Sequence, residues 1–158
     1  MDLTLADLCK QLRVNGVYAY IQEYQPDNPE LEQFLTSALQ AELDKRHLNR
    51  QMRALRQAGF PTKKRFEDLL MDDLPQDGRD AIPALKALAF LAERRNVILI
   101  GNSGTGKTHM AIAIGIRACE ENYRVSFRTA AGLINEMIEA RNENRLSLFI
   151  KQFKKRWC

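Results

Sequence analysis

The chain has 158 residues, of which 45% are hydrophobic and 28% charged, and its net charge is +4. This composition is typical of a globular protein and excludes a disordered chain, a collagen-like repeat and a disulfide scaffold. No apolar run approaches the roughly 18 to 20 residues that span a bilayer. The start lacks the pattern of a secretory signal, and the three widely spaced cysteines indicate free thiols, so we expect a cytoplasmic protein.

Helical periodicity dominates the first half of the chain. Residues 3–24 favour two short helices divided near Gly16, and residues 30–58 favour one long amphipathic helix that ends at Gly59. In the second half of the long helix, an apolar face is expected to lie opposite an arginine face. The apolar residues are Leu48, Met52 and Leu55, and the arginines are Arg46, Arg50 and Arg53.

Eight basic residues and no acidic one lie between residues 45 and 65. Such a block can neutralise several phosphates and predicts salt-sensitive, sequence-independent binding to DNA. The alternative is a solvated helix face, or one that pairs with the acidic N-terminal helices. The candidate DNA-binding residues are Lys45, Arg46, Arg50, Arg53, Arg56, Lys63, Lys64 and Arg65.

The middle of the chain is expected to be a linker followed by a helix. Residues 59–80 look irregular and acidic, and the next helix is expected to begin after Asp80, with Pro83 in its first turn. The expected core face of that helix comprises Leu85, Leu88, Ala89 and Ala92.

The remaining residues read as strand, loop, helix, strand and two helices. The short apolar runs 97–100 and 124–128 are typical of strands, the first of them buried on both faces of a parallel sheet. A helix is expected from about Lys107 to Glu120, and Thr129 is expected to cap the next one. The core face of that next helix would consist of Leu133, Ile134, Met137 and Ile138, and a basic helix is expected from Leu146 onwards.

A phosphate-binding motif lies between the first strand and its helix. Residues 101–108 match G-x-x-x-x-G-K-[ST], in which glycines let backbone N–H groups converge on a phosphate. Lys107 would reach the β- and γ-phosphates, and the Thr108 hydroxyl can ligate Mg²⁺. The candidate ATP-binding residues are Gly101, Asn102, Ser103, Gly104, Thr105, Gly106, Lys107, Thr108 and His109.

The run from Gly101 to Ala111 closely resembles the P-loop of IstB-like ATP-binding proteins, which help insertion sequences to transpose and are related to DnaC-type helicase loaders. Residues 66–68 and 128–134 resemble other segments of that family. The resemblance implies an α/β fold: a small all-helical N-terminal domain, then the first part of a P-loop, AAA+-type, three-layer parallel-sheet domain. The expected domains are a DNA- or partner-binding domain over 1–65, a linker with its helix over 66–95, and the ATPase part over 96–158.

The resemblance also implies a function and some missing parts. The family's ATPase module continues with a Walker B strand, which lies between the first two strands, a sensor residue and an arginine finger. None is found after Thr108, so we expect a chain cut short before Walker B, without catalytic carboxylates and with little or no ATP hydrolysis.

The implied role is that of a transposition helper that binds ATP and Mg²⁺ and assembles on duplex DNA as a homo-oligomer, together with the transposase of the same insertion sequence. One alternative is a replicative helicase loader with a helicase as partner. The other is a non-catalytic module that binds DNA or a partner through residues 1–65.

Overall fold

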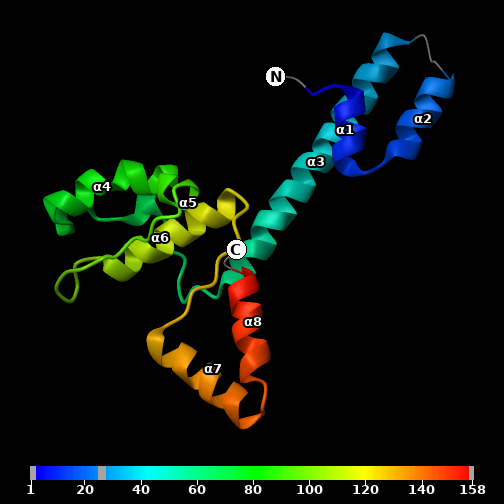
Figure 1. Ribbon diagram of the computed structural model, residues 1–158. Coiled ribbons are helices and arrows are strands. Elements are labelled where there is room, and N and C mark those ends of the chain that lie inside the picture. Colours follow the sequence, from blue (N-terminus) through cyan, green and yellow to red (C-terminus); the bar gives the residue numbers. More distant parts are fainter. Residues whose placement is uncertain (1–2, 25–27, 157–158) are drawn as a thin grey trace. The chain divides into compact units, whose positions relative to one another are not determined.

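The computed structural model describes residues 3–24 and 28–156, and its elements are labelled in Figure 1. Packing divides the chain into two compact units, Met1–Met52 and Arg53–Cys158, which are described separately below. This division falls inside a helix, so residues 53–65 pack with the second unit. No helix in the described ranges is both long and apolar enough to cross a membrane.

The first unit is a small helical assembly. Helix α1 (Leu5–Leu12) begins at Thr4, whose side chain accepts a hydrogen bond from the backbone N–H of Asp7, and ends where Arg13 adopts a left-handed conformation, with φ of 59°. Helix α2 (Asn15–Tyr24) follows, so the expected two short helices are confirmed, but the break falls at residues 13–14 and Gly16 lies inside α2. Leu8, Leu12 and Leu43 form the core of the unit, which joins α1 to the long helix α3 (Pro29–Ala58).

The long helix confirms the expected helix over residues 30–58. It ends before Gly59, whose φ of 74° strains any residue with a Cβ atom. Leu48 and Met52 of the expected apolar face are 58% and 44% exposed. The first unit buries Leu43 instead, with Leu39 packed beside it.

The second unit begins with short helical turns rather than an unbroken linker. Two 3₁₀ turns, η1 (Phe66–Asp68) and η2 (Met71–Asp73), precede α4 (Gln76–Ala87) and α5 (Ala89–Ala92). The expected start of α4 after Asp80 is wrong, because the first turn forms after Pro75 and places Pro83 inside the helix. The sequence pattern did not predict a proline in the middle of this helix. The burial of Ile82 and Leu85 in the core outweighs the loss of the backbone hydrogen bond that the proline removes.

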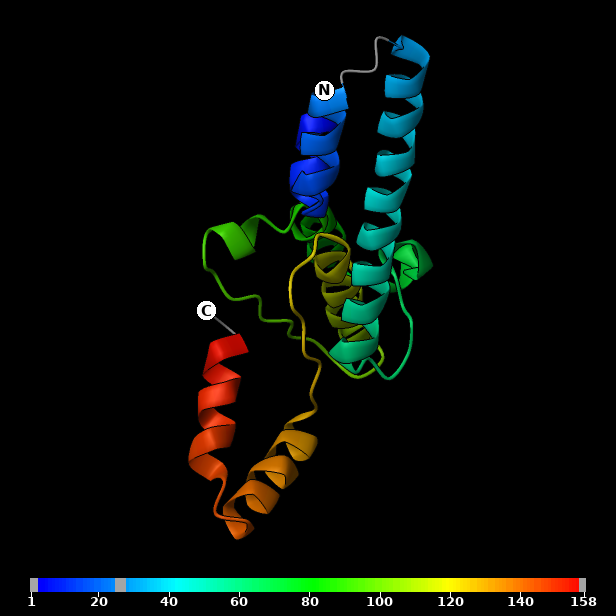
Figure 2. The ribbon, with the colours of Figure 1, turned by 90° about the vertical axis from the view of Figure 1, so that its right-hand side faces the viewer.

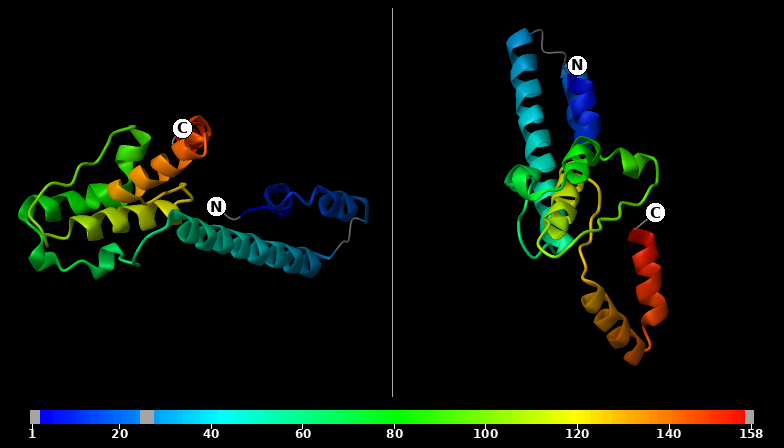
Figure 3. Two further views of the ribbon diagram at one scale, coloured as in Figure 1. Left: turned by 90° about the horizontal axis from the view of Figure 1, so that it is seen from below. Right: turned by 90° about the vertical axis from the view of Figure 1, so that its left-hand side faces the viewer.

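The helix expected from about Lys107 to Glu120 is confirmed as α6 (Lys107–Glu120). It lies beside α4 and the η1 turn, an arrangement that Figure 3 shows from two sides. The core between them consists of Phe66, Leu69, Leu74, Ile82, Leu85, Met110 and Ala113.

The two expected strands are extended but do not form a sheet. No strand is assigned in residues 3–24 or 28–156, and Ile98 and Ile100 are 79% and 90% exposed, so the expectation that the first run is buried on both faces is wrong. The second run instead joins the end of α3, where Phe127 N donates to Ala58 O at 2.7 Å. A strand needs a neighbour for its ladder hydrogen bonds, and these two runs do not pair with each other. The parallel sheet therefore stays a prediction.

The last two helices form a hairpin, visible in Figure 2. Helix α7 (Ala130–Asn142) has the expected cap, because Gly132 N donates to Thr129 Oγ1 at 3.1 Å, and α8 (Leu146–Arg156) follows. The prediction that this face of α7 is buried in a core is wrong, because no described part of the chain covers it. Ile134, Met137 and Ile138 are 56%, 38% and 51% exposed.

Candidate phosphate-binding site

The glycine-rich loop, residues 101–106, leads directly into α6. Gly104 and Gly106 have φ of 84° and 75°, the left-handed region that glycine adopts without strain. The helix begins at once after Gly106, whose carbonyl accepts from Met110 N at 2.8 Å. The N–H groups of the first turn therefore have no acceptor within the helix and, with the positive end of the helix dipole, favour an anion at this point.

Lys107 directs its ammonium group back over the loop. Its Nζ donates to the carbonyl of Asn102 at 2.5 Å and lies 3.4 Å from Thr105 Oγ1. Thr105 Oγ1 donates to the same carbonyl at 2.9 Å, so one carbonyl organises both side chains. Thr108, the next residue, is exposed at the start of the helix. The positive charge of Lys107 thus lies beside the glycine-rich loop.

A hollow of about 750 Å³ opens in front of the loop. Its volume falls within the range of about 300 to 1,000 Å³ that is usual for sites of small molecules. Residues 103–109 form one wall, and the segment between α3 and α4 forms the other. The lining residues of that second wall are Lys63, Lys64, Asp68, Leu69, Leu70 and Leu74.

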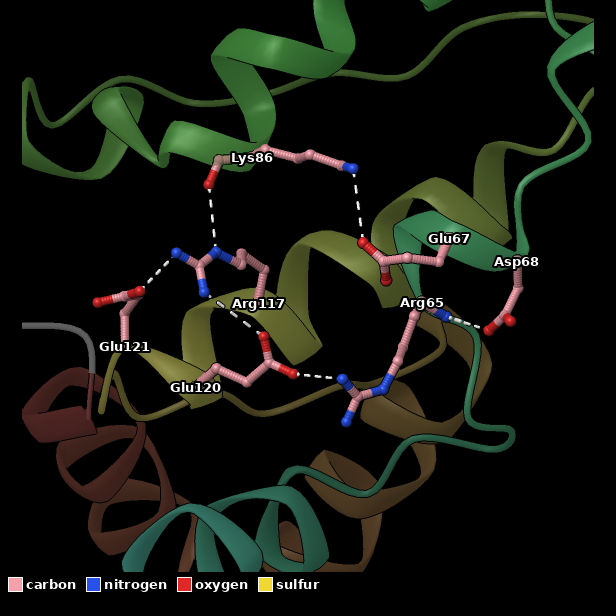
Figure 4. Close-up of polar contacts among 7 residues, drawn as sticks. All are labelled: Arg65, Glu67, Asp68, Lys86, Arg117, Glu120 and Glu121. Atoms are coloured by element: carbon pink, nitrogen blue, oxygen red, sulfur yellow. Dashed lines mark hydrogen bonds and ion pairs between the residues drawn. The ribbon is translucent and has the colours of Figure 1, made fainter. Parts of the chain in front are cut away.

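Arg65 holds the second wall to α6 through its backbone carbonyl and its side chain. The Nε2 atom of His109 lies 2.9 Å from the carbonyl oxygen of Arg65, which makes Nε2 the donor. The guanidinium of Arg65 pairs with Glu120 at 2.8 Å, and its backbone N–H donates to Asp68 at 2.8 Å. Figure 4 shows these last two contacts. One residue is therefore fixed to both ends of α6.

Further polar contacts join α4 to the same assembly, as Figure 4 shows. Lys86 Nζ lies 3.5 Å from Glu67 in η1, and Arg117 of α6 donates to the Lys86 carbonyl at 3.4 Å. These groups are largely exposed, so each pair contributes about 0 to 1 kcal/mol. The buried side chains of Phe66, Leu69 and Leu74 contribute more to holding this segment in place.

The structure separates the basic residues that the sequence had grouped as DNA-binding. Lys45, Arg46 and Arg50 belong to the first unit, and Arg46 there pairs with Glu42 at 2.7 Å and donates to the Leu12 carbonyl at 3.0 Å. The second unit contains the remaining candidates, Arg53, Arg56, Lys63, Lys64 and Arg65.

Within the second unit these candidates have different surroundings. Arg53 and Arg56 are exposed on the last turns of α3, and Arg65 is engaged with Glu120. Lys63 and Lys64 line the hollow. Lys63 and Lys64 therefore differ from Arg53 and Arg56, which do not line the hollow.

Sequence reasoning did not connect the second wall of the hollow with the glycine-rich loop. Asp68, Leu69, Leu70 and Leu74 lie more than 25 residues before the loop, and no spacing rule connects them to it. Of the nine candidate ATP-binding residues, Ser103 to His109 line the hollow, while Asn102 contributes the carbonyl that holds Lys107. The described side chains include no cluster of three or more metal-binding residues. The exposed hydroxyl of Thr108 fits the role of one Mg²⁺ ligand beside phosphate oxygens.

Comparison with known proteins shows which family has this combination. Residues 5–156 match the model of the family described as IstB-like ATP binding protein. The chain is 38% identical over 120 residues to an ATP-binding protein of insertion sequence IS21 from Pseudomonas aeruginosa, covering 76% of this chain and 45% of the relative. It is 28% identical over 128 residues to one of insertion sequence IS5376 from Geobacillus stearothermophilus, covering 81% and 51%. The chain thus spans about half the length of the curated relatives it matches.

Proposed function

The chain belongs to the family of IstB-like ATP-binding proteins, and we propose that it binds ATP with Mg²⁺ as a helper protein of an insertion sequence. The observation that carries the proposal is the hollow in front of the loop, where unpaired first-turn amides and the Lys107 ammonium face one space. Both donors suit a polyphosphate, and the Thr108 hydroxyl would complete the coordination of its metal ion.

Hydrolysis by this chain alone would be slow or absent. Attack on the γ-phosphate needs a carboxylate or amide that orients water, and a second acidic ligand for the metal. As far as the structure describes the hollow, its one carboxylate is Asp68, which already accepts the backbone N–H of Arg65. ATP would therefore act here as a ligand that stabilises a binding-competent state.

The exposed basic residues of α3 support a contact with duplex DNA. Lys45, Arg50, Arg53 and Arg56 are all exposed, and none of them forms an ion pair with another described residue. Arg46 is engaged within the first unit and would contribute less. The names of the relatives place them in insertion sequences, so we propose transposase as the partner and assembly on DNA as the use of the bound nucleotide.

Calorimetric titration with magnesium ATP tests the nucleotide site. The unmodified chain should bind, Lys107→Ala should lose about 100-fold or more in affinity, and Lys151→Ala, an exposed lysine of α8, should bind normally. Equal binding by the Lys107→Ala and Lys151→Ala variants would refute the proposal. A parallel titration with magnesium GTP measures the choice of base.

The DNA contact has its own test. Changing Arg50, Arg53 and Arg56 to glutamate should weaken binding to duplex DNA and flatten its dependence on salt, because each phosphate contact contributes about −0.9 to the slope of log K against log salt. An unchanged slope would reject the assignment. Preference for single strands and a helicase over duplex DNA and a transposase would favour the helicase-loader alternative.

A further inference from the structure

Two lysines outside the glycine-rich motif lie at the same hollow. We propose that Lys63 and Lys64 contact the phosphate groups of the nucleotide, an inference that rests on the proposed function of the loop. They belong to the nucleotide site and not to the DNA-binding surface to which their place in the basic block had assigned them. The continuous block over residues 45–65 thus serves two different polyanions.

The charge balance of the hollow favours an anion with several negative charges. Three lysines line it, Lys63, Lys64 and Lys107, against one acidic residue, Asp68. That carboxylate accepts the backbone N–H of Arg65 at 2.8 Å, so one of its oxygens is already engaged. The first turn of α6 adds its amides and the positive end of its dipole. The hollow therefore carries a net charge of about +2 before the helix dipole is added, which favours an anionic ligand such as a chain of phosphate groups.

The position of the two lysines is fixed by the residues that follow them. Arg65 is held by His109 through its carbonyl at 2.9 Å and by Glu120 through its side chain at 2.8 Å. Phe66, the next residue, is buried in the core beside Met110 of α6. The backbone at Lys64 therefore enters the wall of the hollow in a defined register, even though both lysine side chains are exposed.

The expected effect is moderate because the two ammonium groups are solvated. Exposed ion pairs contribute about 0.2 to 1 kcal/mol, which corresponds to about a 1.4- to fivefold change in affinity for each lysine. Changing both lysines to alanine should therefore weaken ATP binding about tenfold. The loss should be smaller for AMP, which has one phosphate, and should shrink at about 1 M salt, where the screening length falls to about 3 Å.

The experiment compares calorimetric titrations of the complete chain and its variants with magnesium ATP, magnesium ADP and AMP. The test variant is Lys63→Ala with Lys64→Ala. The matched control is Arg141→Ala with Lys151→Ala, which removes the same charge from exposed positions of α7 and α8 that do not line the hollow. The test variant should lose affinity in the order ATP, ADP, AMP, and the control should bind as the unmodified chain does.

Each outcome decides the assignment. Binding that the two lysine changes leave unaltered, while Lys107→Ala abolishes it, overturns this inference and leaves the proposed function standing. No binding by the unmodified chain overturns both. If the test variant loses affinity for duplex DNA and keeps its affinity for ATP, the lysines belong to the DNA surface after all.

His109 should act here as a positioning residue. Its Nε2 holds the Arg65 carbonyl, so His109→Ala should release the wall and weaken ATP binding, whereas His109→Gln, which keeps an N–H donor, should restore most of the affinity. In the background of Lys63→Ala and Lys64→Ala, the further loss from His109→Ala should be much smaller. Full additivity of the two effects would show that His109 does not act through the lysines.

Discussion

The change Gly115→Ala should destabilise the second unit, although alanine is the better helix former. Gly115 lies in the middle of α6, where exchange of glycine for alanine normally stabilises a helix by up to about 1 kcal/mol. A Cβ atom at this position would meet the ring of Phe60 at 2.7 and 2.8 Å. The effects of this change on packing and on helix propensity therefore act on stability in opposite directions.

The magnitude follows from how far the ring can move. Ordinary contact begins near 3.4 Å, so the ring would have to retreat by about 0.7 Å. The ring of Phe127 is next to that of Phe60, with ring centroids 6.0 Å apart, and the new Cβ would also lie 3.4 Å from Val125 Cγ1. Overpacking typically costs about 1 to 3 kcal/mol, which exceeds the gain in propensity and leaves a net loss of about 1 kcal/mol. The corresponding fall in Tm is about 4 to 8 °C for a unit of this size.

Thermal and urea unfolding followed by circular dichroism measure the effect. Gly78→Ala in α4 is the matched control, since a Cβ there meets Pro75 only at 3.6 Å and should be neutral or stabilising. Phe60→Leu should remove the clash, so that Gly115→Ala becomes neutral in that background. A Tm that rises equally for both glycine changes would refute the reasoning from packing.

Two further predictions concern titratable groups. Hydrogen bonds from Thr4 lower the pKa of Asp7, so the contribution of Asp7 to stability is present above about pH 4 and is lost as the pH falls through the lowered pKa. In acid unfolding, the stability of the Asp7→Asn variant should therefore converge with that of the unmodified chain at low pH. A difference in stability that persists at low pH would contradict this. Burial raises the pKa of both Cys9 and Cys119, so native thiol labelling followed by mass spectrometry should be slow at each. In urea, labelling of the two thiols should report the unfolding of the first and second units separately, and native labelling at the rate of a free thiol would exclude their burial.

Local signals in the sequence predicted the helices well. The start of α6, the end of α3 at Gly59 and the cap at Thr129 each depend on a few neighbouring residues, and the structure confirms all three. The apolar runs were harder to interpret, because a strand depends on a partner far away in the chain. Ile98 and Ile134 have the pattern of buried residues yet lie exposed, since the described residues cover neither.

In the candidate site, too, the sequence predicted local features but not those that depend on residues far away in the chain. The motif predicted the loop and its helix, because glycine geometry and spacing are local properties. It did not predict the second wall, which tertiary packing of Phe66 and Leu69 brings to α6. Charge clustering likewise grouped Lys63 with Arg50, although the fold places them in different units. Charge clustering alone therefore does not show which ligand each of these residues would bind.

The extended run 97–100 has a practical consequence for handling the protein. Four β-prone apolar residues in a row, with Ile98 and Ile100 exposed and no ladder partner in the described chain, resemble the edge strands that nucleate intermolecular aggregation. We therefore expect this run to favour β-rich aggregation in concentrated samples. The stretch that leads the chain into its glycine-rich loop would then also set how densely the molecules can be kept in solution.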